Sequence, residues 1–199
     1  MGSKGGVMAI RRTTVHRLKV TLREVEPAIW RRIEVSSDMK LSALAGVLEG
    51  AMGWLGGHLH AFEIDGVSYG IPDGGGFGLR TTIDERKTKL GEVLPAVESA
   101  MRWDYDFGDG WEHDVVVEAI EPRQVGVASP VCREGNRACP PEDCGGPWSY
   151  CDLLDALADP THERHEELSE WAPPGFDPEA FDVEVATEMM GWIRLSPEW

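Results

Sequence analysis

The stretch YDFGDGWEHD, Tyr105–Asp114, decides the fold because it contains the turn between two strands of alternating character. In residues 103–107 and again in residues 111–118, aromatic or aliphatic side chains largely alternate with polar ones, as in strands with one buried face. Gly108-Asp109-Gly110 separates the two runs and suits a tight connection. The stretch therefore predicts a β-hairpin with a three-residue loop, with aromatic side chains on one face and acids on the other.

Residue spacing outside the hairpin predicts the other elements. Four more strands are predicted at His16–Val25, Ile29–Val35, Leu59–Asp65 and Val67–Tyr69. Helical segments are predicted at Leu41–Met52, ended by Gly53, at Trp148–Ala158, at His162–Trp171, capped by Thr161, and at Pro178–Leu195. Strands followed by helices indicate the α+β class. We expect a single domain over residues 10–195, with a mostly antiparallel curved sheet, one early helix and a helical C-terminal part.

Length and composition point to a globular protein. The chain has 199 residues, and 42% of them are apolar, so a core can form without disulfides or metal. No apolar run approaches the roughly 18 residues that span a bilayer, and residues 1–14 lack the apolar core of a signal peptide. We expect a cytoplasmic protein with reduced cysteines and no membrane partner. Residues 1–9 are expected to be a flexible N-terminus, in which Met1-Gly2-Ser3 resembles a cloning leader.

Charge is unevenly distributed along the chain. Residues 1–100 carry 13 basic and 12 acidic side chains, whereas residues 101–199 carry 6 basic and 23 acidic ones. An acidic half repels phosphate backbones, so the composition disfavours nucleic acid as a partner. The exception is a possible basic face on the N-terminal strands, formed by Arg11, Arg12, Arg17, Arg31 and Arg32. This face supports a third, weaker hypothesis, a nucleic-acid accessory factor, against the alternative of a solvated strand surface.

The acids of the hairpin do not form an EF-hand. Counted from Asp104, the fifth, sixth and twelfth positions are Gly108, Asp109 and Val115, where that motif needs a ligand, a glycine and a glutamate. Asp104 and Asp106 still share one strand face and can join a metal or substrate site with residues from elsewhere. Solvated strand faces carry such pairs as well, so both interpretations stay open.

Histidines offer a second candidate site. His58 and His60 lie two apart on a predicted strand, so their side chains point the same way and can share a divalent metal. His113 can supply a third imidazole if the hairpin packs beside them. The alternative is that these histidines are ordinary polar strand residues with hydrogen bonds to their neighbours.

Four cysteines within twenty residues form a third candidate, a structural zinc site. Cys132, Cys139, Cys144 and Cys151 are separated by six, four and six residues, without the Cys-x-x-Cys pairs that zinc ribbons prefer. Cys151 falls in a predicted helix and can belong to the core. A structural zinc held by Cys132, Cys139 and Cys144 is therefore an alternative to the histidine site.

Several motifs together resemble the plasmid pRiA4b ORF-3-like family, whose members are also described as insertion-element passenger proteins. The motifs are Pro27–Arg32, Gly53-Trp54, His58–Phe62, Tyr105–His113, Ala138–Pro147 and Phe176–Phe181. The resemblance covers most of the chain and implies a single α+β domain associated with plasmids and mobile elements. It implies no reaction or ligand. The chain departs from the family pattern at Trp148-Ser149, where a glycine is frequent.

Two main hypotheses on function follow. The first is a non-enzymatic binding module, a monomer or small homo-oligomer, that recognises a protein or small-molecule ligand through an acidic, Trp-lined cleft. Its candidate binding residues are Asp104, Asp106, Asp109, Trp111, His113, Glu142, Asp143 and Trp54. The second is a metal-dependent, hydrolase-like enzyme that uses His58, His60 and His113 with Asp106 or Asp109. No catalytic residue is identified, and a divalent metal is the cofactor considered.

Overall fold

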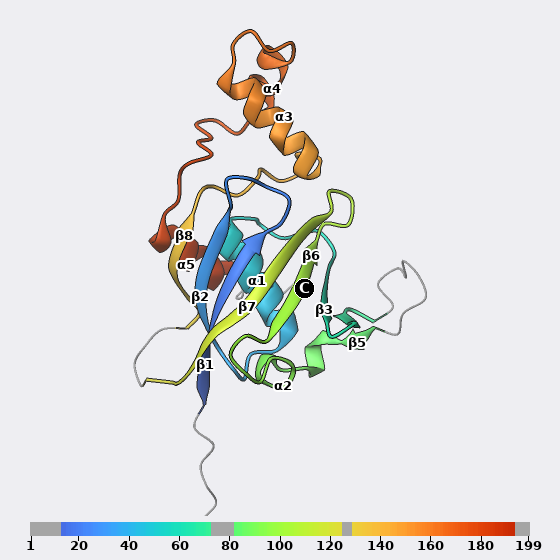
Figure 1. The fold of residues 1–199 in the computed structure, drawn as a ribbon, viewed down its shortest axis with the longest axis vertical. Helices are drawn as coiled ribbons and strands as arrows, with labels where there is room; N and C mark the ends of the chain where they lie inside the picture. Colours follow the sequence, from blue (N-terminus) through green and yellow to red (C-terminus); the bar gives the residue numbers. More distant parts are fainter. Residues whose placement is uncertain (1–12, 73–81, 125–128, 194–199) are drawn as a thin grey trace, which may run out of the picture.

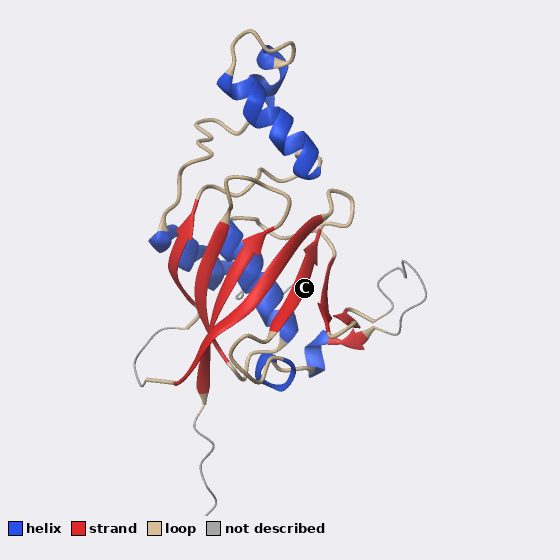
Figure 2. Ribbon diagram, in the orientation of Figure 1, coloured by secondary structure: helices blue, strands red, loops and turns tan. Residues whose placement is uncertain are grey.

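A computed structural model describes residues 13–72, 82–124 and 129–193, and shows a large sheet with helices on one face and at one end (Figures 1 and 2). The strands are β1 (Thr14–Leu22), β2 (Trp30–Ser36), β3 (His60–Ile64), β4 (Val67–Gly70), β5 (Ile83–Asp84), β6 (Ala100–Tyr105), β7 (Trp111–Pro122) and β8 (Val131–Asn136). Their order in the sheet is β5-β4-β3-β6-β7-β1-β2-β8. Apart from the parallel pair β4–β5, neighbouring strands are antiparallel.

The helices are α1 (Leu41–Met52), the short α2 (Leu90–Val93), α3 (Gly146–Ala158), α4 (His165–Trp171) and α5 (Val183–Ile193), with a 3-10 turn η1 (Glu85–Lys87). Helices α1 and α5 cover one face of the sheet, whereas α3 and α4 project beyond one end of it (Figure 1). Gly50 makes the close crossing of α1 and α5 possible, because a Cβ there would lie 2.7 Å from the backbone of Met189. Across the described ranges, none of the helices is both long and apolar enough to cross a membrane.

The core lies between the sheet and α1, and alternation along the strands builds it. In β7, Trp111, His113, Val115 and Val117 point inward, as their alternation predicts. Trp103 in β6 is buried on the same face. Register shifts in the β1–β7 and β2–β8 pairings bend the strands.

The predicted α+β class is confirmed, with a mostly antiparallel sheet, one early helix and a helical C-terminal part. Helix α1 has the predicted bounds, and Gly53 ends it in the left-handed conformation, with φ of 104°. The predicted flexible residues 1–9 lie outside the described part of the chain.

Three local predictions are wrong. The hairpin turn is longer than three residues, because Tyr105 pairs with Trp111 and residues 106–110 form the connection. Helix α4 starts at His165, because the Thr161 hydroxyl donates to Asp159 in the preceding turn instead of capping a helix. The last helix is Val183–Ile193, shorter than predicted at its start.

Candidate functional site

The turn of the β6–β7 hairpin is held by the first of its acids. Asp106 has a φ of 51°, and its Oδ1 accepts hydrogen bonds from the backbone N–H groups of Gly108 at 2.9 Å and Asp109 at 3.4 Å. The Asp106 carbonyl also accepts a hydrogen bond from Gly110 N. One carboxylate oxygen thus closes the turn, and the other, Oδ2, lies near the His58 ring.

Asp109 joins this turn to the loop that precedes α3. Its Oδ2 accepts a hydrogen bond from the backbone N–H of Gly145 at 2.9 Å. The two segments approach so closely that a Cβ on Gly146 would lie 2.3 Å from the Asp109 carbonyl oxygen. The contact fixes the position of the acidic pair Glu142 and Asp143, just before Cys144, relative to the hairpin.

His58 lies in the connection between α1 and β3, beside the β6–β7 turn and the loop before α3. Its Nδ1 is 3.4 Å from Asp106 Oδ2, and its Nε2 is 3.5 Å from Asp143 Oδ1 and 3.8 Å from Glu142 Oε2. One ligand atom from each of His58, Asp106 and Asp143 can be chosen so that all lie within 4.8 Å of one another. We call His58, Asp106, Glu142 and Asp143 the His58 cluster.

Glu142 is the most firmly positioned acid of the His58 cluster. Its Oε1 accepts hydrogen bonds from the backbone N–H of Leu55 at 3.0 Å and from the Tyr105 hydroxyl at 3.3 Å. Burial raises the pKa of Glu142, and the nearby charge of Asp143 acts in the same direction, whereas the hydrogen bonds and His58 oppose it. Burial and Glu142 likewise raise the pKa of the Tyr105 hydroxyl, which therefore stays a proton donor.

His60 belongs to a second, deeper group of charges. Its Nε2 is 3.0 Å from Glu85 Oε2, and its Nδ1 is 3.7 Å from Glu49 Oε1. Both glutamates are buried, and burial raises the pKa of Glu49, with a further contribution from the charges of Glu142 and Glu85. The two histidines that are neighbours in sequence therefore have separate sets of acidic partners.

A groove of about 640 Å³ runs beside Glu142 and Asp143, between the end of α1, the loop before α3 and the segment that leads into α5. Its apolar lining includes Met52, Trp54, Pro140, Pro141, Trp171, Phe176, Phe181, Val185 and Met189. Trp54 is nearly fully buried and donates from Nε1 to the Pro140 carbonyl at 3.0 Å, whereas Trp171 is 44% exposed. The predicted candidates Trp54, Glu142 and Asp143 thus lie along one groove.

The structure places other predicted site residues elsewhere. Trp111 and His113 are buried in the aromatic core, where the His113 ring lies 4.5 Å from that of Trp103. His113 Nδ1 is 3.2 Å from the Trp103 carbonyl oxygen, and burial lowers the pKa of His113 to about 3. Asp104 forms an ion pair with Arg102 at 2.8 Å. The proposed grouping of His58, His60 and His113 is therefore not found among the described residues, where the metal-ligand group contains only His58 of the three.

The four cysteines are free thiols. Cys132 is buried, Cys139 and Cys144 are partly buried, and Cys151 is exposed. Burial is the main cause that raises the pKa of Cys139, and burial likewise raises the pKa of Cys144 to about 12. No cysteine belongs to a group of three metal-ligating side chains within the described ranges.

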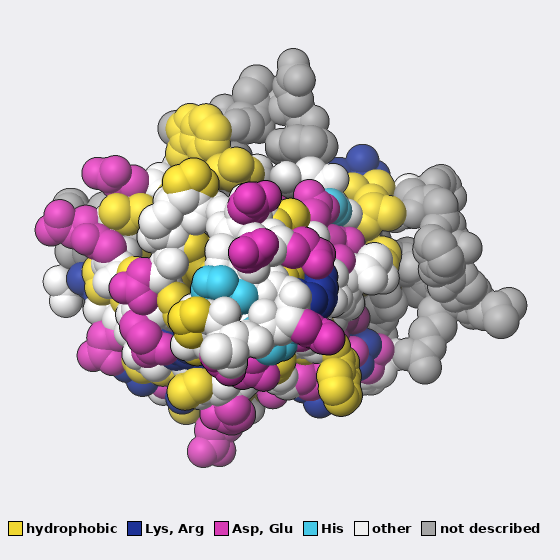
Figure 3. Space-filling view, turned by 90° about the horizontal axis from the view of Figure 1, so that it is seen from above, with side chains coloured by type: hydrophobic (Ala, Val, Ile, Leu, Met, Phe, Trp, Pro, Cys, Tyr) yellow, Lys and Arg dark blue, Asp and Glu magenta, His cyan; other side chains and the backbone are white. Residues whose placement is uncertain are grey.

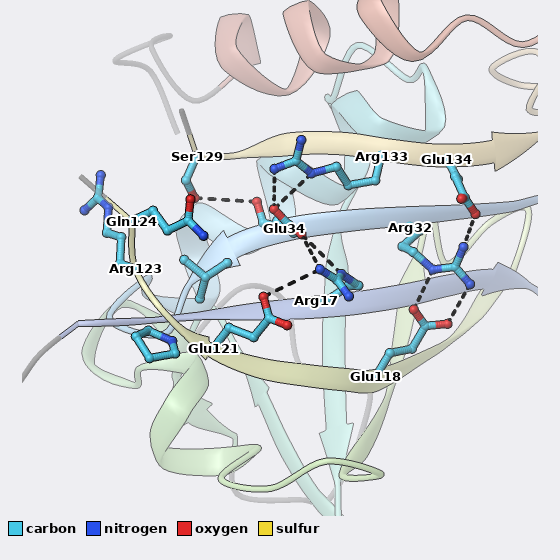
Figure 4. Close-up of a pocket in the computed structure, with 12 residues that line it drawn as sticks. Arg17, Arg32, Glu34, Glu118, Glu121, Arg123, Gln124, Ser129, Arg133 and Glu134 are labelled. Carbon is cyan, nitrogen blue, oxygen red and sulfur yellow. Dashed lines mark hydrogen bonds and ion pairs between the residues drawn. The ribbon is translucent and has the colours of Figure 1, made fainter. Parts of the chain in front are cut away.

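The described arginines of the predicted basic face all have partners within the protein. Arg17 pairs with Glu34 and Glu121, and Arg32 with Glu118 and Glu134, around a second pocket of about 610 Å³ (Figure 4). Burial lowers the pKa of Arg31, and its guanidinium donates hydrogen bonds to backbone carbonyls. Arg11 and Arg12 lie outside the described residues. At the end that carries α3 and α4, acidic side chains cover far more of the surface than basic ones (Figure 3).

Sequence analysis missed three residues of this region, Glu49, Glu85 and Trp171. Glu49 lies within an otherwise apolar stretch of α1, and Glu85 lies in a short charged run that looks solvated. The position of Glu49 among apolar helix residues was the one signal that could have marked it. Nothing in the sequence around Trp171 indicates that it lines a groove with Trp54.

Comparison with known proteins agrees with this architecture. The model of the plasmid pRiA4b ORF-3-like protein family matches residues 14–185. The chain is 46% identical over 165 residues to the uncharacterized protein y4hQ of Sinorhizobium fredii (strain NBRC 101917 / NGR234), covering 79% of this chain and 80% of that protein. It is also similar to the crystal structure of a protein of unknown function, MM3350, from Methanosarcina mazei Go1. The TM-score is 0.76 and the identity 34%, over 87% of this chain and 97% of the other. The chain therefore belongs to the plasmid pRiA4b ORF-3-like protein family.

Proposed function

We propose that the protein is a non-enzymatic, cytoplasmic binding module whose groove takes a partner polypeptide segment that carries both apolar and basic side chains. The observation that carries this proposal is the groove beside α1, with its apolar lining and its acidic edge. Association with plasmid or mobile-element genes is part of the proposal, and the family assignment supports it. The four free cysteines are consistent with a reducing compartment.

The apolar lining supports a partner with hydrophobic side chains. Trp171 is partly exposed at the groove, and Val185 on α5 is 56% exposed on the same groove. Exposed aromatic and aliphatic side chains beside a concavity are typical of sites where a partner buries an anchor residue. Pro140 and Pro141 stiffen the part of the lining that they form, so less conformational entropy is lost when a partner binds.

Charge supports a basic partner. Glu142, Asp143 and Asp182 contribute carboxylates to the groove. The cation among the lining residues, Arg31, is committed elsewhere: it donates to the carbonyls of Ala51, Trp30 and Asn136, and its guanidinium lies over the ring of Phe181. With a net charge of −16, the chain attracts basic segments at long range and repels acidic ones.

The test is selection of binders from a random peptide library on immobilised protein, followed by affinity measurement on two tryptophan variants. We expect enriched peptides to combine aromatic or aliphatic residues with Lys or Arg. Trp171→Ala is expected to weaken their binding at least about tenfold, as truncation of an interface anchor does. Trp148→Ala is the matched control, because Trp148 is 89% exposed and does not line the groove. Peptides that bind both variants equally, or that are acidic, would contradict the proposal.

A further inference from the structure

We propose that His58, Asp106 and Asp143 bind one divalent transition-metal cation, with Zn²⁺ as the best match, at the acidic end of the groove. This site goes beyond the proposed function, because its ligand is a cation and not a polypeptide, although Asp143 contributes to both the site and the groove. The three ligands come from three separate segments: the α1–β3 connection, the β6–β7 turn and the loop before α3.

The three ligand atoms must move closer together to accept an ion. The three ligand atoms lie within 4.8 Å of one another, and donors around tetrahedral zinc are roughly 3.4 Å apart. Asp106 Oδ1 is held by the turn, which leaves Oδ2 directed at His58. The side chain of Asp143 is 77% exposed and can rotate toward the ion.

The donor set selects the class of cation. One imidazole nitrogen with two carboxylate oxygens is a mixed set that suits Zn²⁺ and similar first-row ions better than Ca²⁺ or Mg²⁺, which prefer oxygen alone. Three protein ligands leave the fourth position of a tetrahedral ion for a water. Glu142 Oε2, at 3.8 Å from His58 Nε2, is positioned to accept a hydrogen bond from such a water.

Electrostatics gives an independent reason for a cation here. Within the described ranges, the carboxylates of Glu49, Asp106, Glu142 and Asp143 have imidazoles, and no Lys or Arg, within ion-pair distance. Glu49 is nine-tenths buried, and the basic side chain that it contacts among the described residues is His60, at 3.7 Å. Its buried charge adds to the negative potential that Glu142 and Glu85 create, and a cation beside His58 would offset that potential.

The test is calorimetric titration of metal-free, tag-free full-length protein with Zn²⁺, supported by the visible absorption of the Co²⁺ complex. We expect one equivalent per chain. His58→Ala and Asp143→Asn should each weaken binding at least about tenfold. Asp143→Asn is conservative, because asparagine also tolerates the positive φ of 58° at this position.

The matched control is His162→Ala, because His162 forms a similar surface pair with Asp152 at 3.6 Å but lies on the α3–α4 hairpin. It should leave the affinity unchanged. Absence of saturable binding overturns the proposal. So does binding that His58→Ala leaves intact, and so does binding lost only in Cys139→Ser or Cys144→Ser, which would assign the ion to thiolates. Peptide binding by the groove is measured in chelator, so failure of either proposal is distinguishable from failure of the other.

Discussion

Substitution of Gly146 by alanine tests the contact that holds the hairpin against the loop before α3. Gly146 has a φ of 84°, and a Cβ there would lie 2.3 Å from the Asp109 carbonyl oxygen. The left-handed conformation costs an L-residue about 1–2 kcal/mol, and forcing apart well-packed groups costs about 1–3 kcal/mol more. Gly146→Ala should therefore lower the free energy of unfolding by roughly 2–5 kcal/mol.

The control is Gly110→Ala in the β6–β7 turn, on the other side of the contact. Gly110 has a φ of 74°, but a Cβ there would have nothing within 4 Å, so only the conformational cost of about 1–2 kcal/mol applies. The difference between the two variants isolates the contact with Asp109. If Gly146→Ala is no less stable than Gly110→Ala, the described approach of the two segments is incorrect.

Urea denaturation followed by tryptophan fluorescence is a suitable assay, because Trp54, Trp103 and Trp111 are buried and change environment on unfolding. The measurements are made in chelator, so that metal binding does not contribute to stability. Should Gly146→Ala fail to fold, Asp109→Asn is the milder probe. It weakens the hydrogen bond from Gly145 N and should cost about 0.5–1.5 kcal/mol.

Three further predictions concern the core and its titratable groups. Gly50→Ala should destabilise the protein by about 1–3 kcal/mol, because it opens the α1–α5 crossing. Gly191→Ala, in open space on α5, should stabilise it by up to about 1 kcal/mol. Shifts of the urea midpoint in the same direction for both variants would contradict this. Glu49 has a raised pKa in the folded state, so its contribution is favourable below the unfolded pKa of about 4.3 and is lost as pH rises through the folded value. Glu49→Gln should therefore stabilise the chain at about pH 7 and make no difference at about pH 4. A urea midpoint of the variant equal to that of the unchanged protein at both pH values would refute this. His113 has a lowered pKa, so its contribution is present above about 6.5 and is lost as pH falls toward about 3. In His113→Phe, the free energy of unfolding should fall less steeply as pH is lowered over that range. An unchanged slope would show that His113 is not buried in its neutral form.

Local sequence patterns determine much of the sheet and the first helix. The alternation in residues 111–118 places β7 and its buried face correctly, because the side chains of a strand alternate between two faces. The spacing of Leu41, Leu44 and Leu48, followed by Gly53, gives the bounds of α1. These features depend on neighbours in sequence, so they can be predicted without a partner segment.

The His58 cluster and the groove depend on contacts between distant segments. His58 and His60 are two residues apart, a spacing that predicts one shared site. In the structure His58 lies beside Asp106 and Asp143. His60 instead lies beside Glu49 and Glu85. The sequence supplied the residue types, including most of the acids, but did not indicate which would meet.

His113 shows the same division. Alternation alone determined that it shares a face with Trp111, but the packing of the sheet against α1 decided that this face is the core and not a site wall. Likewise, the Asp109–Gly145 contact across 36 positions of sequence brings the acidic loop to the turn. Local periodicity determines which face of its element a side chain lies on, whereas the packing of distant segments determines which residues it contacts. The reason is that burial and electrostatic contacts depend on all the elements that surround the side chain.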